Sequence, residues 1–152
     1  MNKVNKGDEE FGDKCEKLFL SKFKNVIKNS EDKNDEIDFK HKTKKIIYEL
    51  KGRNYNFNHC EDWKVGYNKL IYADKNYIGY KFYIYMLFYD GLWYWKFNKN
   101  EIEDKMCGYC DRVDRGKKET KYYFNIKREL FTKSKIDIKA PKPPDPFEKC
   151  LL

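Results

Sequence analysis

The sequence lacks any long apolar run. Its longest, residues 82–89, is far shorter than the roughly 20 residues that a membrane-spanning helix needs. Residues 1–10 are polar and charged, so they do not form the apolar centre of a signal segment. The five cysteines are an odd number, which argues against a framework of paired disulfides. These absences predict a soluble, intracellular protein of a reducing compartment, the cytoplasm.

Alanine is almost absent, and all four prolines lie between positions 141 and 146. What the chain has instead is charge and aromatic rings. A net charge of +8 favours a polyanionic partner such as nucleic acid, because Lys and Arg neutralise phosphates and release their counterions. The 25 acidic residues are interspersed, so this charge is a surplus over the whole chain and not a basic tail. No membrane partner is expected.

Apolar spacing predicts the order helix, strand, strand, helix, strand, strand, strand. Spacings of three, four and eight residues indicate a first helix at 9–29, and alternation indicates strands at 37–39 and 46–51. The further elements expected are a helix at 62–74, a doubly buried strand at 80–89, a turn at Asp90-Gly91, a strand at 92–97, a polar loop at 98–120, a strand at 121–126 and a helical turn at 127–130.

The length of 152 residues suits one domain with a substantial core. Residues 1–8 are expected to form a disordered lead-in and residues 9–131 the domain. Residues 132–152, which hold all the prolines and several lysines, are expected to form a tail.

The most informative residues are Asp38, Glu49 and Lys51. Alternate side chains of a strand point to opposite faces, so Glu49 and Lys51 share a face. The apolar neighbours of Asp38 define the buried side of the preceding strand, and a hairpin across 42–45 brings Asp38 close to Glu49. Two such carboxylates can hold a hard divalent cation, and a lysine can orient a metal-bound water. The alternative is a surface hairpin of alternating charges.

With the elements around it, this triplet resembles the PD-(D/E)xK nuclease superfamily, which has the restriction-endonuclease-like fold. The resemblance covers about residues 9–130 and is closest to small single-domain members from large DNA viruses. The matching segments are Glu49-Leu-Lys-Gly-Arg53, Gly66-Tyr-Asn-Lys-Leu-Ile-Tyr-Ala73, the aromatic strand after them and Asp90-Gly91. One departure is Ile37, where a proline commonly precedes the Asp.

The resemblance implies an α/β fold with a mixed central sheet flanked by helices. It implies Mg²⁺-dependent hydrolysis of phosphodiester bonds, with Mn²⁺ as a substitute and with DNA as the partner rather than RNA. Asp38, Glu49 and the Leu50 backbone carbonyl would bind the metal, and Lys51 would assist the water. A homodimer is compatible with this family, and a viral protein would act in the host cytoplasm or the virion.

Five further residues are candidates around this site. Glu16 on the first helix would add a catalytic carboxylate or lie on a solvated helix flank. Lys69 on the second helix would face the site or be a surface lysine, and Arg53 would suit a phosphate contact. Arg112 and Arg115 belong to a basic loop that would clamp a backbone phosphate or remain solvated.

Two other functions stay open. The first is a catalytically silent nucleic-acid-binding module of the same fold. The second is a structural zinc protein built on Cys107-x-x-Cys110, with His59 and Cys60 as distant ligands, although the absence of a second well-spaced pair favours two unligated loop thiols. The aromatic segment 82–97 could stack bases, but its unbroken apolar character predicts core.

Overall fold

A computed structural model describes residues 6–29, 35–102, 107–112 and 119–143. Within these residues the chain has two helices and nine strands, arranged as one sheet of six strands and one of three. The elements are α1 (Lys6–Lys22), β1 (Val26–Lys28), β2 (Phe39–His41), β3 (Ile46–Gly52), β4 (Asp62–Gly66), α2 (Tyr67–Asn76), β5 (Lys81–Phe88), β6 (Gly91–Lys96), β7 (Cys107–Arg112), β8 (Glu119–Lys127) and β9 (Thr132–Lys133), with short 3-10 turns at Phe57–His59, Lys99–Glu101 and Arg128–Leu130. Neither described helix is long and apolar enough to cross a membrane.

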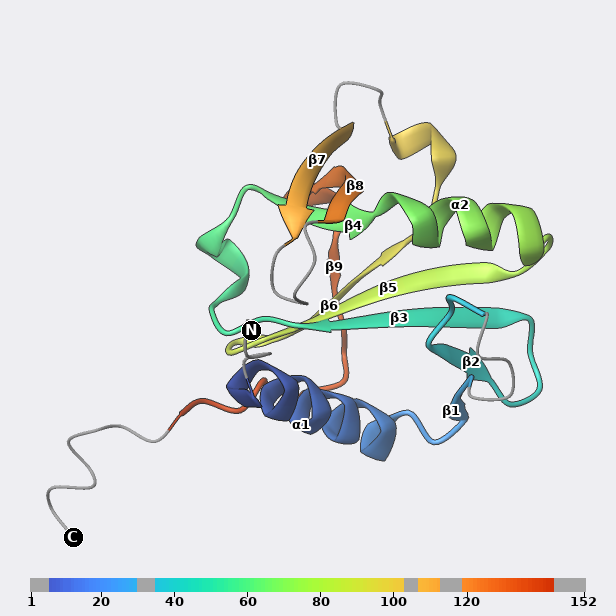
Figure 1. Ribbon diagram of the computed structural model, residues 1–152. Coiled ribbons are helices and arrows are strands. Elements are labelled where there is room, and N and C mark those ends of the chain that lie inside the picture. Colours follow the sequence, from blue (N-terminus) through green and yellow to red (C-terminus); the bar gives the residue numbers. More distant parts are fainter. Residues whose placement is uncertain (1–5, 30–34, 103–106, 113–118, 144–152) are drawn as a thin grey trace, which may run out of the picture.

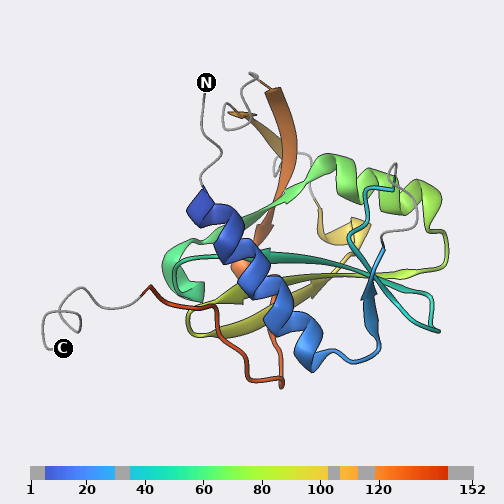
Figure 2. The same cartoon turned by 60° about the horizontal axis from the view of Figure 1, so that its bottom comes forward.

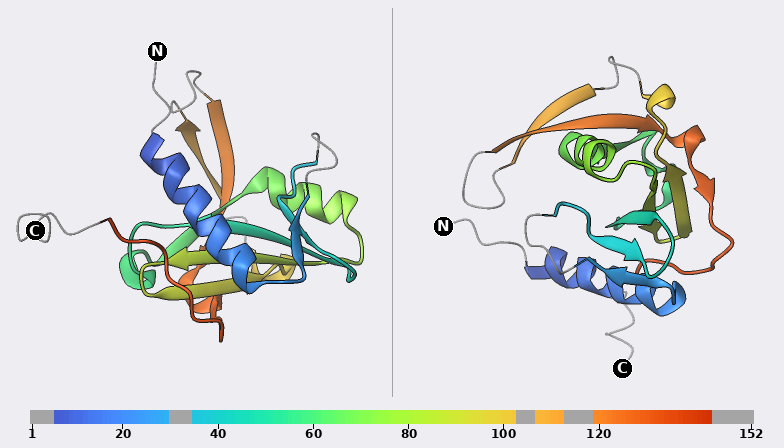
Figure 3. Two further views of the ribbon diagram at one scale, coloured as in Figure 1. Left: turned by 90° about the horizontal axis from the view of Figure 1, so that it is seen from below. Right: turned by 90° about the vertical axis from the view of Figure 1, so that its right-hand side faces the viewer.

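The six-stranded sheet is mixed, with the strand order β1-β2-β3-β5-β6-β9. Its central pair, β3 and β5, is parallel, and the other neighbours are antiparallel. Helix α1 lies along one face, whereas α2 and the three-stranded sheet β4-β8-β7 lie on the other (Figures 1 and 3). The expected mixed α/β architecture with a central sheet between helices is therefore confirmed.

The core fills both sides of the central sheet. Ile84 and Met86 of β5 point to the α2 side, and Tyr85 and Leu87 point to the α1 side, with each side chain at most 9% exposed. Full burial of such a side chain stabilises the fold by about 1.5–3 kcal/mol. The prediction of a strand buried on both faces is confirmed, as is the hairpin that follows it. Gly91 in that hairpin has a φ of +148°, which residues with a side chain rarely adopt.

The first helix ends earlier than the sequence predicts. α1 stops at Lys22, and β1 begins after a turn in which the Val26 N–H donates to the Phe23 carbonyl (3.1 Å). Val26 and Ile27 continue the apolar spacing of α1, so the local pattern does not separate helix from strand. Backbone pairing of β1 with β2 decides the strand. At its other end α1 starts at Lys6, within the expected lead-in.

The second helix begins later than predicted, because residues 62–66 form a strand. Trp63 and Val65 of β4 are buried, while Asp62 and Lys64 between them are exposed, which is the two-residue period of a strand. β4 pairs antiparallel with β8, and α2 starts only at Tyr67.

The segment 98–120 is not the plain loop that the sequence predicts. It includes a 3-10 turn and strand β7, which pairs antiparallel with the beginning of β8. β8 itself starts at Glu119, two residues before the expected strand. The helical turn expected after it is confirmed at Arg128–Leu130.

Residues 132–143, expected to belong to a tail, pack on the domain. β9 adds to the edge of the central sheet beside β6, and the chain then passes near α1 (Figure 2). Ile138 and Ala140 are buried in the core on that side, and the Ala140 N–H donates to the Phe88 carbonyl (2.8 Å). The apolar residues between the lysines account for this attachment.

Candidate functional site

Strand pairing places Asp38 beside Glu49. Phe39 of β2 lies opposite Tyr48 of β3, and opposite residues of an antiparallel pair share a face. Asp38 directly precedes β2, so it falls next to Glu49 on the face that α2 covers. The two carboxylates differ in environment: the Asp38 side chain is 47% exposed and that of Glu49 only 5%. The site therefore has one buried and one accessible carboxylate.

Two lysines complete this cluster. Lys69 in the first turn of α2 places its Nζ 2.9 Å from Glu49 Oε2 and 3.0 Å from Asp38 Oδ2. Lys51, two residues along β3, lies with its Nζ 3.4 Å from Glu49 Oε1. The structure thus brings together four predicted site residues from β3, α2 and the start of β2. We call Asp38, Glu49, Lys51 and Lys69 the charged cluster.

Burial and the neighbouring charges shift the pKa values of Glu49 and Lys69. Desolvation raises the pKa of Glu49 from 4.5 to about 7, since the lowering by Lys51 and Lys69 does not offset burial and the nearby Asp38 charge. Burial alone would lower the pKa of Lys69, but the charges of Glu49 and Asp38 outweigh it and raise that pKa. Lys69 is therefore a cation at neutral pH, whereas Glu49 exchanges its proton near neutrality.

The cluster meets the ligand needs of Mg²⁺ in part. Among the residues that the structure describes, no three Asp, Glu, His or Cys side chains converge as a metal-binding group. Mg²⁺ usually binds through one or two carboxylates and keeps several waters. Asp38 and Glu49 supply two carboxylates, and their oxygens already hold one cation, the Lys69 ammonium, between them. The exposure of Asp38 gives water access to the same place.

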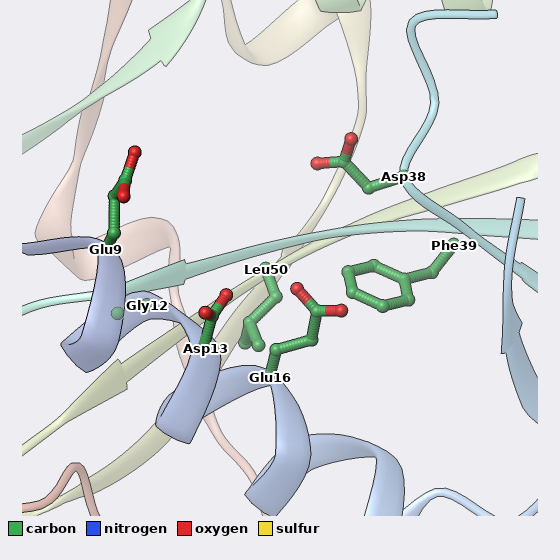
Figure 4. A pocket seen from close by; sticks show the side chains of 8 residues that line it. Glu9, Gly12, Asp13, Glu16, Asp38, Phe39 and Leu50 are labelled. Atoms are coloured by element: carbon green, nitrogen blue, oxygen red, sulfur yellow. The ribbon is translucent and has the colours of Figure 1, made fainter. Parts of the chain in front are cut away.

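Glu16 lies apart from the charged cluster. Its carboxylate pairs with Lys28 of β1 at 2.5 Å. It nevertheless lines the same hollow as Asp38, a space of about 400 Å³ that Leu50 also borders (Figure 4). The other acidic residues around this hollow are Glu9 and Asp13 of α1. The structure therefore places Glu16 beside the site without a direct contact to Glu49.

The remaining candidates lie elsewhere or outside the described residues. Arg53 follows β3 and donates from its guanidinium to the Gly52 carbonyl (2.9 Å). Arg112 is the last residue of β7, but its side chain and the whole of Arg115 lie outside the described part. The side chains of Cys107 and Cys110 also lie outside it.

The two distant zinc ligands have other surroundings. The His59 ring stacks on Tyr55 with centroids 4.3 Å apart, and Cys60 is a half-buried free thiol. Neither belongs to a metal-binding group in the described part of the chain.

A polar network that the sequence did not reveal holds the Asp38 segment. Asp35 accepts hydrogen bonds from the Tyr77 hydroxyl, from Asn29 Nδ2 (2.8 Å) and from the Ile37 N–H (2.9 Å). The Asn29 N–H in turn donates to the Asp38 carbonyl (2.8 Å). Tyr77 follows α2, so the network ties this segment to the helix that carries Lys69. Asp35 and Tyr77 are 42 positions apart, and no local pattern links them.

Tyr77→Phe is expected to destabilise the protein by about 1–2 kcal/mol, since the Asp35 carboxylate loses one hydrogen-bond donor at a partly exposed site. Urea unfolding with an unchanged m value would measure this loss. Tyr80→Phe is the matched control, because the Tyr80 ring packs against that of Tyr77 and its hydroxyl does not take part in the Asp35 network. Equal midpoints for Tyr77→Phe and the wild type would contradict the role of this network.

Comparison of the chain with protein-family models, with curated proteins and with solved structures finds no match. The residues of the charged cluster and their geometry therefore carry the argument on function.

Proposed function

We propose that the protein is a Mg²⁺-dependent nuclease of the PD-(D/E)xK type that hydrolyses phosphodiester bonds in DNA. The observation that carries the proposal is the convergence of Asp38, just before β2, with Glu49 and Lys51 of β3. Glu49 and Lys51 meet at 3.4 Å, and the Lys69 ammonium bridges the two carboxylates. A surface hairpin of alternating charges would not bury Glu49 to 4% exposure.

Asp38, Glu49 and the adjacent Leu50 carbonyl would hold the metal ion. When bound, Mg²⁺ would neutralise phosphate charge and lower the pKa of a coordinated water. Burial of Glu49 on the α2 side fixes one carboxylate, and the exposure of Asp38 leaves the other open to solvent and substrate. Mn²⁺, which has similar ligand preferences, would substitute.

Lys51 is suited to the chemical step. Its side chain is 28% exposed and its Nζ lies near one oxygen of Glu49, so it can reach a water or a phosphate oxygen beside the carboxylates. A preorganised positive charge stabilises the negative charge that develops on the phosphate oxygens in the transition state.

The arrangement of elements supports the same proposal. A helix precedes the Asp38 segment, the Glu-x-Lys strand β3 lies in the centre of the sheet, and α2 leads from there to the parallel strand β5. This is the element order that suggested the restriction-endonuclease-like fold. β8 corresponds to the strand expected at 121–126, and β1, β4, β7 and β9 are additions to that order.

A second candidate is a nucleic-acid-binding module with the same fold and no catalysis. The observation that favours it is the position of Lys69, whose ammonium contacts both carboxylates and so balances their charge without a metal ion. Such a protein would bind nucleic acid through its net charge of +8 alone.

The purified full chain is expected to cleave DNA with Mg²⁺ or Mn²⁺ and not with EDTA. Asp38→Asn is expected to lower the cleavage rate by about 10²–10³-fold, as loss of one charge-stabilising group does, and to weaken Mg²⁺ binding in calorimetry. Glu36→Gln is the control, because Glu36 is an exposed carboxylate two residues away. If no DNA is cut, or if Asp38→Asn binds Mg²⁺ and cuts like the wild type, the nuclease proposal is wrong and the silent module remains.

A further inference from the structure

A second, larger hollow adjoins the charged cluster. Its volume is about 990 Å³, and it runs between the first half of α1, the end of β3 and residues 141–143. It shares Gly12, Leu50 and Gly52 with the smaller hollow that Asp38 and Glu16 border. We call it the α1 groove. Lys51 lines the α1 groove and contacts Glu49, so the groove leads to the charged cluster.

Cations from three separate segments line the α1 groove. Lys14 comes from α1, Lys51 and Arg53 from the end of β3, and Lys142 from the segment after β9. Against these four positive charges stand the two carboxylates of Asp8 and Glu10. The positive surplus lies at the end of β3 and on the segment after β9, whereas on the α1 wall Lys14 stands beside both carboxylates. A chain of phosphates is therefore expected to follow the β3 and C-terminal walls, with Lys14 as the contact on the α1 side.

One aromatic ring in the groove is suited to stack against a base. Tyr55 is not, since its ring already stacks between His59 and Trp63 at centroid distances of 4.3 and 5.7 Å. The ring of Tyr89 is half-buried and has the Lys142 ammonium 5.6 Å from its centroid. A phosphate that draws Lys142 away would uncover this face for a base.

We propose that the α1 groove binds an unpaired strand of nucleic acid and leads it to the charged cluster. Lys14, Arg53 and Lys142 bind successive phosphates, and Tyr89 stacks on one base. Only an unpaired strand offers a base face to an aromatic ring, whereas a duplex presents its phosphates and groove edges. This inference rests on the proposed nuclease function and names the substrate form of the same site.

Binding is tested with EDTA present, so that no cleavage is needed, by fluorescence anisotropy of a labelled oligodeoxynucleotide and its duplex. The single strand is expected to bind at least about tenfold more tightly than the duplex. Lys14→Glu and Lys142→Glu should each weaken its binding about tenfold and reduce the slope of log K against log salt by about 0.7 for each lost phosphate contact. Tyr89→Leu should weaken it by roughly tenfold through lost stacking.

Lys17→Glu and Lys139→Glu are the matched controls. Lys17 is an exposed lysine of the same helix, Lys139 is an exposed lysine of the same C-terminal segment, and neither lines the groove. Equal affinity for strand and duplex, or equal losses in the groove variants and these controls, would overturn the inference. The four lysines are exposed, so their variants are expected to fold like the wild type, which the half-buried Tyr89 does not guarantee for Tyr89→Leu.

The two proposals fail in different ways. A chain that cuts DNA but loses no affinity on substitution of Lys14, Lys142 or Tyr89 keeps the nuclease function and refutes the α1 groove. A chain that binds the single strand through these residues but cuts nothing with Mg²⁺ refutes the nuclease function, and with it the delivery of the strand to a catalytic site.

Discussion

Glu49→Gln is expected to make the protein more stable above pH 7 and at the same time to remove its Mg²⁺ site. Burial raises the pKa of Glu49 from 4.5 to about 7 in the folded state. Between these two values the folded state binds more protons than the unfolded state, so stability falls as pH rises. The loss of unfolding free energy is complete above pH 7. A pKa shift of this size corresponds to about 3 kcal/mol, since each pKa unit is worth about 1.36 kcal/mol.

A glutamine has nearly the same shape and no charge to desolvate. It should therefore match the wild type near pH 4, below both pKa values, where Glu49 is largely protonated in the folded and the unfolded state. It should exceed the wild type by up to about 3 kcal/mol near pH 8. Lys69 does not disturb this comparison, because its raised pKa lies above that range and its charge is constant.

Urea unfolding of both proteins at about pH 4 and about pH 8 measures the difference. Glu36→Gln, which replaces an exposed carboxylate, should change stability little at either pH. Added Mg²⁺ should raise the unfolding midpoint of the wild type and leave that of Glu49→Gln unchanged, since binding to the folded state alone stabilises it. If Glu49→Gln is less stable at pH 8 than the wild type, the attraction of Lys51 and Lys69 fully offsets the desolvation of the Glu49 carboxylate.

The desolvation cost at Glu49 favours a functional role for the charged cluster over a structural one. A buried ion cluster seldom contributes net stability, because the desolvation of its charges offsets their attraction. An apolar residue at position 49 would suit the neighbours of β3 on the α2 side better than a carboxylate does. The presence of Glu49 beside Lys51 and Lys69 is therefore better explained by chemistry at the site than by folding.

Strand alternation was sufficient to predict the charged cluster in outline. The two-residue period places Glu49 and Lys51 on one face, and the apolar neighbours of Asp38 place it on the same side. The burial of Glu49 could not be predicted in this way. Glu49 is buried because α2 crosses that face of the sheet. The sequence predicts α2 from its helical periodicity alone, which does not show where the helix packs. Depth below the surface depends on tertiary packing and not on the order of residues in one strand.

The errors in the fold have a similar origin. Val26 and Trp63 fit a helical apolar pattern as well as a strand, and hydrogen bonds to strands far along the chain decide between the two. The sequence of β7 has no alternation of apolar and polar residues that would indicate a strand. Its hydrogen-bonded pairing with β8 makes it one. The sequence thus predicts the central strands, which are buried on both faces, better than the edge strands and the smaller sheet.

Replacing Lys51 and Lys69 separately by Met is expected to separate catalysis from metal binding. The Lys69 ammonium lies 2.9 and 3.0 Å from the two carboxylates and occupies the place between them. A divalent cation that binds there must displace it, so Lys69→Met should bind Mg²⁺ roughly tenfold more tightly, the equivalent of one charge-assisted hydrogen bond. Lys51 contacts one oxygen of Glu49 only, at 3.4 Å, and its replacement should change Mg²⁺ affinity much less.

The cleavage rate should show the opposite order. Lys51→Met should lower it by about 10²–10³-fold, as removal of one preorganised charge at a transition state does. Both variants are measured by calorimetry and by cleavage above pH 8, because loss of a neighbouring positive charge raises the pKa of Glu49 further. Lys75→Met, an exposed position of α2, controls for the loss of one positive charge.

The assignment of the two lysines depends on this contrast. If Lys51→Met loses Mg²⁺ binding and cleavage together, Lys51 supports the carboxylates and not the water. If Lys69→Met binds Mg²⁺ no better than the wild type, the cation does not enter between Asp38 and Glu49, and the metal site lies elsewhere. A tenfold gain in Mg²⁺ affinity for Lys69→Met and a hundredfold loss of rate for Lys51→Met would instead mean that Lys69 competes with the metal ion for the carboxylates, whereas Lys51 contributes to the chemical step.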